Sequence, residues 1–163
     1  MADKIFVKNN VSFALRWAKV TDADTIARLE LSSAHFEHRA HPFTFTHPQF
    51  SKLWENRIKG NELKTMLACG AKSVYGFLTF KNEIKLGQIL ALYIDPLYMK
   101  HGIGTVLMQT AEHMVRQKGG NAMMVDVEVL NDGGIAFYEK LGFVKTVRKL
   151  DHLIVMKKEI VND

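Results

Sequence analysis

Apolar residues in the N-terminal third of the chain follow a pattern that predicts one strand and then two helices. The strand covers Val11–Arg16. Thr21 is a residue type that commonly caps helices, and apolar residues follow it at helical spacing, so a helix is predicted over about Asp22–His35. A second amphipathic helix is predicted over about Pro48–Gly60, because proline suits the first helical turn.

Three strand-like segments occupy the middle of the chain, and short turn-like segments separate them. They are Lys64–Cys69, Ser73–Lys81 and Leu86–Ile94, and they predict an antiparallel meander. Leu86–Ile94 is almost wholly apolar, which is typical of a strand that is covered on both faces. Pro96 ends it, because proline cannot donate a hydrogen bond to a sheet.

Helices and strands alternate in the C-terminal part of the chain. The predicted elements are a helix over Gly102–Lys118, a strand over Ala122–Val129, a helix over Asn131–Leu141, and strands over Phe143–Arg148 and His152–Lys157. The whole order predicts a single α/β (α+β) domain over residues 1–163. We expect a mixed, mostly antiparallel sheet of about six to seven strands with about four helices on its two faces.

The composition is that of a folded protein with a modest basic excess. Apolar residues make up 47% and charged residues 24%, and the formal net charge is +5. Because the Lys and Arg residues are scattered rather than clustered, we expect an anionic small-molecule cofactor and no nucleic-acid partner. No apolar run approaches the length of a membrane span and the N-terminus lacks a signal-peptide pattern, so a cytoplasmic protein is expected. The single cysteine, Cys69, predicts neither a disulfide nor a cysteine-rich metal site.

The segment after Ile94 carries the clearest chemical signal. A strand ends, a short loop follows, and a long helix begins at Gly102 and Gly104, which have no Cβ and so are expected to let phosphate oxygens approach the backbone. The amides of a first helical turn have no intrahelical partner and the helix dipole is positive there, so an anion such as phosphate can bind. Lys100 and His101 add donors beside the glycines. The alternative is a tight turn with close helix–sheet packing and no ligand.

A second cluster begins at Asn131, which can cap the last predicted helix. Tyr138 follows seven residues later, two helical turns on, so both side chains project from a similar face. A ligand could contact both of them. The alternative is a cap and a half-buried core aromatic.

Together these two clusters resemble the GNAT superfamily of acetyltransferases. The phosphate loop of that family corresponds to Met99–Gly104, and its later signature corresponds to Asn131–Phe143. The resemblance is strong over about Leu86–Phe143 and rests on element order elsewhere. Met99 stands where the family usually has Arg or Gln, so phosphate binding there is expected to rest on backbone amides, with Lys100 as a side-chain substitute.

The resemblance implies that acetyl-CoA is the co-substrate. The loop would hold its diphosphate through Met99, Lys100, His101, Gly102, Ile103, Gly104 and Thr105. The pantetheine arm would run along the backbone of Leu92, Tyr93 and Ile94, and Asn131 would contact it as well. The strand over Ala122–Val129 would splay from Leu86–Ile94 and leave a slot for the thioester.

The resemblance also implies direct attack by an amine within a ternary complex, in which Tyr138 protonates the leaving thiolate. Glu128 is the expected general base, with Tyr93 and Asp95 as alternatives. His35 and His38 fall in the region that lines the acceptor site in this family, and they are expected to contact the substrate; the alternatives are plain surface or capping roles and, from the histidine spacing, a metal site.

The acceptor itself is the least specified part of the prediction. We expect a small-molecule amine. The alternatives are a protein or peptide amine as acceptor, and a catalytically inactive module that senses CoA. No membrane partner is expected, and a homodimer is compatible with the sequence.

Overall fold

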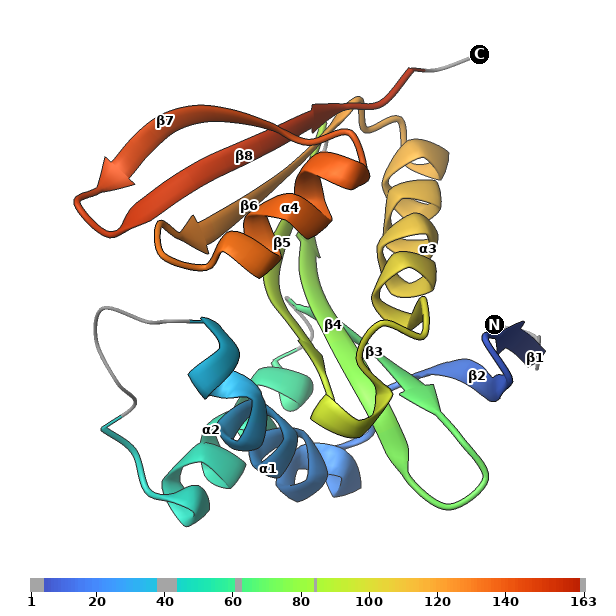
Figure 1. Ribbon diagram of the computed structural model, residues 1–163. Coiled ribbons are helices and arrows are strands. Elements are labelled where there is room, and N and C mark those ends of the chain that lie inside the picture. The colour runs from blue at the N-terminus through green and yellow to red at the C-terminus, as the bar shows by residue number, and fades with distance from the viewer. Residues whose placement is uncertain (1–4, 38–43, 61–62, 84, 162–163) are drawn as a thin grey trace.

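The computed structural model describes residues 5–37, 44–60, 63–83 and 85–161, and these residues form one sheet with helices on both faces (Figure 1). In spatial order the eight described strands are β1 (Ile5–Lys8), β2 (Val11–Trp17), β3 (Lys64–Cys69), β4 (Val74–Asn82), β5 (Leu86–Ile94), β6 (Ala122–Glu128), β8 (Leu153–Glu159) and β7 (Val144–Leu150). Only the β5–β6 pair is parallel among them. The predicted fold class is confirmed, with one strand more than expected.

Four helices and three short 3₁₀ turns complete the described chain. The helices are α1 (Ala23–Ser33), α2 (His47–Lys59), α3 (Ile103–Gln117) and α4 (Asp132–Lys140). The 3₁₀ turns are η1 (Val20–Asp22), η2 (Ala34–Glu37) and η3 (Pro96–Tyr98). The single helix predicted over Asp22–His35 is therefore divided into η1, α1 and η2. Thr46 caps α2 in a capping box with Gln49, just ahead of the predicted proline start.

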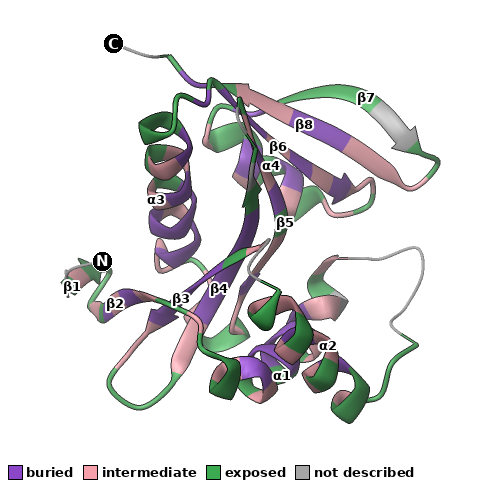
Figure 2. Cartoon of the chain, turned by 180° about the vertical axis from the view of Figure 1, so that it is seen from behind, coloured by how far each residue is buried: buried purple, intermediate pink, exposed green. Residues whose placement is uncertain are grey.

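The sheet separates two apolar cores, because strand side chains alternate between its faces. Met66 of β3 packs into the core under α3 and α4, whereas the next residue, Leu67, packs into the core under α1 and α2. Figure 2 shows buried residues along these strands and on the helix sides turned toward them. The two cores fix the helices against a common sheet and thereby place the ends of β5 and β6.

The missing strand in the prediction is β1, which forms a hairpin with β2. It has only four residues, and Ile5 and Val7 are exposed, so it has no buried face that a sequence pattern could reveal. Its turn is specified instead by backbone conformation. Asn9 and Asn10 both have positive φ, of 47° and 65°, as a two-residue hairpin turn that matches strand twist requires.

Candidate functional site

The strands β5 and β6 pair at one end and separate at the other. Their parallel ladder runs from Leu86 opposite Ala122 to Ile89 opposite Val125 and stops there. Beyond that point β5 continues only beside β4, and β6 continues only beside β8. Figure 1 shows the two strands diverging, with α4 beside the opening. One backbone edge of Leu90–Ile94 therefore has no strand partner within the described chain.

This divergence also changes the expected burial of β5. In the first half of the strand the face with Gly87 and Ile89 is buried, whereas Leu86 and Gln88 on the other face are only half-buried, so the predicted cover is complete on one face only. Leu90 is 47% exposed, and Leu92 and Ile94 are only half-buried. The apolar run therefore spans two environments. The first half of β5 has one face in the core, and the second half forms one wall of the opening.

The helix α3 begins beside this opening without a side-chain cap. Its N-cap residue is Gly102, and the first helical hydrogen bond runs from the Val106 amide to the Gly102 carbonyl. The amides of Ile103, Gly104 and Thr105 precede that bond, and no described residue accepts a hydrogen bond from them. These three donors and the positive end of the helix dipole suit an anion.

The loop before α3 is held in a defined shape by its own backbone. Lys100 has a positive φ of 63°, which is uncommon for a residue other than glycine. The His101 ring nitrogen Nδ1 lies 2.9 Å from the Met99 carbonyl oxygen and forms a hydrogen bond with it. Lys100 is exposed, and Met99 and His101 are half-buried. Lys100 and His101 are thus the loop residues with side-chain donors directly before the helix start.

The two glycines of this segment are packed against protein atoms. Gly102 has a φ of 77°, and a Cβ there would lie 3.6 Å from the aliphatic carbons of Lys8. A Cβ on Gly104 would lie 3.3 Å from the ring of Phe137 and 3.8 Å from Ile94. Both positions thus serve close packing in the direction of the missing side chain. The expectation that both glycines clear space for phosphate explains neither of these contacts.

The second predicted cluster lies on α4. The Asn131 Oδ1 atom accepts a hydrogen bond of 2.8 Å from the Gly134 amide, so the predicted helix cap is present. Tyr138 is 8% exposed and packs edge-on against Phe137 and Phe143. No described residue forms a hydrogen bond with its hydroxyl group. Burial, and then the negative charge of Glu37, raise the pKa of this hydroxyl above its ordinary value.

Two carboxylates, Glu128 and Glu37, belong to this region, and Glu128 lies on the opposite side of the sheet from Tyr138. Val125 and Val127 of β6 face the core that contains Tyr138, so the alternating position Glu128 faces the side of α1 and α2. Glu37 comes from η2, which follows α1, and its charge acts on Tyr138. Sequence analysis did not single out Glu37; its place just after the predicted acceptor-site histidine was the only available signal.

The other predicted site residues have more varied surroundings. Tyr93 is buried in the core under α1 and α2, with its ring 5.5 Å from that of Phe77. The Asp95 Oδ1 atom accepts a hydrogen bond of 2.9 Å from the Leu97 amide and so shapes η3. His35 belongs to η2, its side chain is not described, and His38 lies outside the described residues.

Neither a metal cluster nor a membrane-spanning helix occurs in the part of the chain that the structure describes. No three His, Cys, Asp or Glu side chains among residues 5–37, 44–60, 63–83 and 85–161 come together as metal ligands would. No helix within these ranges has the length and apolar character to cross a bilayer.

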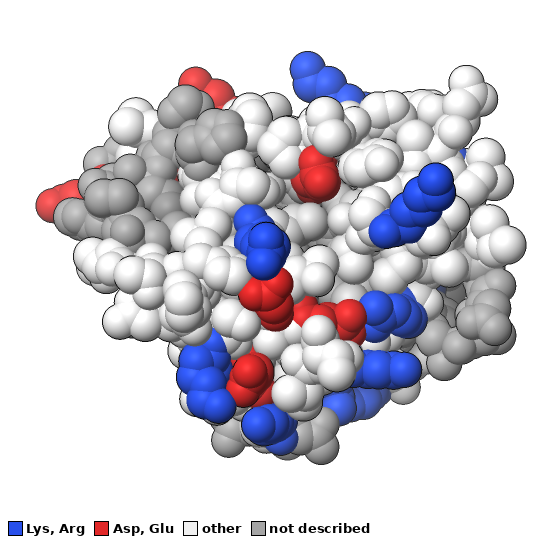
Figure 3. All heavy atoms as spheres, turned by 90° about the horizontal axis from the view of Figure 1, so that it is seen from below, with Lys and Arg blue, Asp and Glu red and all other residues white. Residues whose placement is uncertain are grey.

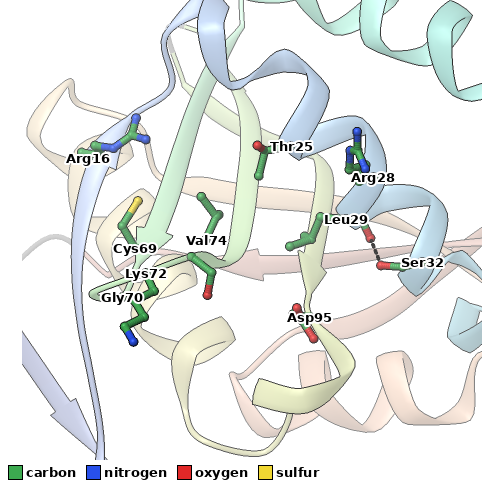
Figure 4. Close-up of a pocket in the computed structure, with 11 residues that line it drawn as sticks. Arg16, Thr25, Arg28, Leu29, Ser32, Cys69, Gly70, Lys72, Val74 and Asp95 are labelled. Carbon is green, nitrogen blue, oxygen red and sulfur yellow. Dashed lines mark hydrogen bonds between the residues drawn. The ribbon is translucent and has the colours of Figure 1, made fainter.

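A separate hollow of about 660 Å³ lies between α1 and the turn that joins β3 to β4 (Figure 4). Its two arginines are already paired: Arg16 with Asp22 at 2.7 Å and Arg28 with Asp24 at 2.8 Å. Figure 3, which views the molecule from below, shows basic and acidic side chains interleaved over that face. Asp95, one of the alternative bases, lines the hollow, but none of the predicted cofactor-binding residues does.

Comparisons with known proteins agree with this geometry. The model of the "Acetyltransferase (GNAT) family" matches residues 26–143. Over 131 residues the chain is 26% identical to a ribosomal-protein-bS18-alanine N-acetyltransferase of Escherichia coli, covering 77% of this chain and 85% of the relative. It is 31% identical over 78 residues to N-alpha-acetyltransferase 30 of Schizosaccharomyces pombe, covering 45% of this chain and 52% of the relative.

Solved structures share the fold. A PaiA N-acetyltransferase of Thermoplasma acidophilum, solved in complex with coenzyme A, matches with a TM-score of 0.77 at 19% identity, over 90% of this chain and 98% of its own. Ard1 of Thermoplasma volcanium matches with a TM-score of 0.71 at 20% identity, over 92% of this chain and 99% of its own.

Proposed function

Because the chain belongs to the GNAT family of acetyltransferases, we propose that it transfers the acetyl group of acetyl-CoA to an amine by direct attack within a ternary complex. The observation that carries this proposal is the end of the β5–β6 ladder at Ile89 and Val125. It leaves an open backbone edge on β5, flanked by the uncapped start of α3 and by Tyr138.

The start of α3 is the proposed diphosphate site. The amides of Ile103, Gly104 and Thr105 donate to the phosphate oxygens, with Gly102 as the helix cap. Lys100 and His101 add positive charge or donors, and Met99 contributes backbone and apolar contact only. The loop is already held in shape by the His101–Met99 hydrogen bond, so little ordering is required on binding.

The open edge of β5 is the proposed site of the pantetheine arm and the thioester. Backbone groups of Leu92, Tyr93 and Ile94 that β4 does not engage pair with the arm, as they would with another strand, except the Ile94 carbonyl, which accepts a hydrogen bond of 3.1 Å from the Ser33 hydroxyl. The Oδ1 atom of Asn131 is engaged by Gly134, which leaves the amide nitrogen to donate to the arm. An amide of the same β5 edge stabilises the oxyanion that develops on the thioester carbonyl.

The proposed chemistry needs one acid and one base. The acceptor nitrogen forms a bond to the acetyl carbon, and the C–S bond of the thioester breaks. Glu128 takes a proton from the acceptor ammonium, directly or through a water, before the neutral amine attacks, on the side of the sheet that α1 and α2 cover. Tyr138 donates a hydrogen bond to the departing sulfur from the other side and gives up its proton as the C–S bond breaks, and the second proton that the acceptor nitrogen then loses restores the phenol, whose raised pKa favours the protonated form.

We propose an α-amine of a peptide or protein as the acceptor. The expectation of a small-molecule acceptor rested on no residue of this chain. The support for a peptide comes from the two relatives named above, one a ribosomal-protein alanine N-acetyltransferase and the other an N-alpha-acetyltransferase. His35 and His38, close in sequence to Glu37, are the residues proposed to contact that acceptor.

A thiol-release assay with acetyl-CoA tests this proposal. The panel contains peptides with free N-termini, the same peptides with blocked N-termini and one internal lysine, and small polyamines and amino sugars. We expect release of CoA only with the free α-amine peptides, and a product that is acetylated at the N-terminus by mass spectrometry. Release with small amines alone contradicts the acceptor class, and no release with any amine contradicts the transfer activity.

A further inference from the structure

The β1–β2 hairpin packs directly on the start of α3. The Cβ and Cγ carbons of Lys8 lie 3.6 Å, and its Cδ 3.8 Å, from the place where a Cβ of Gly102 would be. The side-chain amide nitrogen of Asn9 lies 3.3 Å from the Lys100 carbonyl oxygen and donates a hydrogen bond to it. Consecutive residues of the hairpin therefore contact both the loop and the helix cap.

The hairpin is held in this position by its own turn and by the core. Lys8 pairs with Val11 across the turn, and Asn9 and Asn10 take the positive φ angles that the turn requires. Two residue pairs further along the same ladder, the ring of Phe6 stacks on that of Phe13 at 5.5 Å, and Phe13 is part of the core under α3. Lys8 thus projects from an anchored element rather than from a loose terminus.

The charges at this contact are all of one sign. Lys8 and Lys100 are exposed, and no carboxylate among the described residues pairs with either ammonium group. Neither the hairpin segment Ile5–Val11 nor the loop Met99–Thr105 contains an Asp or Glu. The methylenes of Lys8 cover Gly102, so its ammonium group is two bonds beyond a carbon that already touches the helix start. An anion at that helix start would relieve the repulsion between these groups.

We propose that Lys8 is a phosphate-binding residue, which pairs with the diphosphate of acetyl-CoA and closes the phosphate site from the β1–β2 hairpin. The assignment rests on the proposed function for the presence of CoA at α3. Lys8 would thus supply a side-chain cation to a site in which the Met99 side chain has no hydrogen-bond donor. Asn9 positions the hairpin through its hydrogen bond to Lys100.

Calorimetric titration of CoA into the Lys8→Met variant tests this assignment. Methionine keeps an unbranched stem that can cover Gly102, so the variant removes the ammonium group with little loss of packing. We expect CoA to bind about tenfold more weakly, because one charge-assisted hydrogen bond is lost. Lys72→Met, in the turn between β3 and β4, is the matched control because it removes the same charge elsewhere, and it should bind CoA like the wild type. An unchanged thermal midpoint for Lys8→Met verifies its fold.

Dephospho-CoA, which lacks the 3′-phosphate, identifies the phosphate that Lys8 contacts. Equal weakening for both ligands supports the diphosphate, whereas weakening for CoA alone overturns that assignment in favour of the 3′-phosphate. Wild-type affinity in Lys8→Met overturns the role of Lys8 and leaves the proposed function intact. A wild-type protein that binds neither ligand overturns the proposed function, and the assignment of Lys8 with it.

Discussion

The hydroxyl of Tyr138 is surrounded by groups that favour its protonated form. The ring is buried between Phe137 and Phe143, and the nearest charge that acts on it is the carboxylate of Glu37. Both burial and a like charge oppose formation of a phenolate, which raises the pKa. A phenol of this kind remains a hydrogen-bond donor at any physiological pH, as an acid that assists a leaving thiolate must.

The same shift predicts a loss of stability in alkali. Tyrosine in an unfolded chain loses its proton near pH ~10, whereas native Tyr138 keeps its proton to higher pH. Above that pH the unfolded state binds fewer protons than the native state, so the free energy of unfolding falls as pH rises. Urea unfolding of the wild type and Tyr138→Phe at neutral and strongly alkaline pH measures this. The variant should lose less stability than the wild type, and parallel losses would contradict the shift.

Gly104 is a second residue whose role depends on its neighbours. Because a Cβ would lie 3.3 Å from Phe137, alanine requires a small movement of that ring and valine a larger one. We expect Gly104→Val to lose about 1–3 kcal/mol of stability by overpacking, and Gly104→Ala much less. Calorimetry should show weaker CoA binding in the valine variant, since Phe137 adjoins Tyr138. A valine variant as stable as the wild type would show that the Phe137 ring moves aside at little cost in free energy.

For these residues the sequence predicted the element on which each one lies better than it predicted the contacts that each one makes. Asn131 caps α4 as its residue type suggested, and Tyr138 lies on the predicted helix. The need for glycine at the start of α3 was also predicted, but its contacts with Lys8 and Phe137 join distant parts of the chain. Glu37 was missed for the same reason, because only the folded chain brings η2 within electrostatic reach of α4.

At the scale of elements, α1 and α2 are joined by a buried polar contact. The indole Nε1 of Trp54 donates a hydrogen bond of 2.7 Å to the Glu30 carboxylate, and these residues are 0% and 6% exposed. The apolar spacing of both helices predicted their existence. It did not predict that a carboxylate would lie between them, since a charged residue is normally expected on the solvent side of a helix.

Removal of this hydrogen bond should therefore destabilise the helix pair. Trp54→Phe keeps an aromatic ring but removes the N–H group, and leaves a carboxylate oxygen of Glu30 without that donor. We expect a loss of about 1–3 kcal/mol in urea unfolding. Trp17→Phe on β2 is the control, because Trp17 is 37% exposed and should tolerate the change. Equal stability of both variants would show that the Trp54 hydrogen bond contributes little.

Element boundaries were predicted best where strands are buried and turns are short. The bounds of β3 and β5 agree with the predicted ones, because apolar runs there end at clear turn signals. The prediction missed β1, since a strand of four residues in which only Phe6 is half-buried gives no period. This omission concealed the hairpin that carries Lys8, and with it the contact at Gly102.

At the scale of the whole molecule, the opening between β5 and β6 follows from how the sheet is assembled. The two strands pair through Ile89 and Val125, and then each keeps only its outer neighbour. The sequence alone implied this divergence only through the family resemblance. No periodicity marks where a parallel ladder stops, because the stop depends on which neighbour each strand keeps in the folded sheet.

We propose that this opening supports acetyl transfer with Tyr138 as the acid. The most direct measurement is the turnover of Tyr138→Phe with saturating acetyl-CoA and an accepted amine, alongside the calorimetric affinity for CoA. We expect kcat to fall by about 10²-fold or more, because a general acid usually contributes that much, while the affinity for CoA stays close to that of the wild type. A variant that binds CoA normally and turns over at the wild-type rate would contradict the role of Tyr138 as the acid.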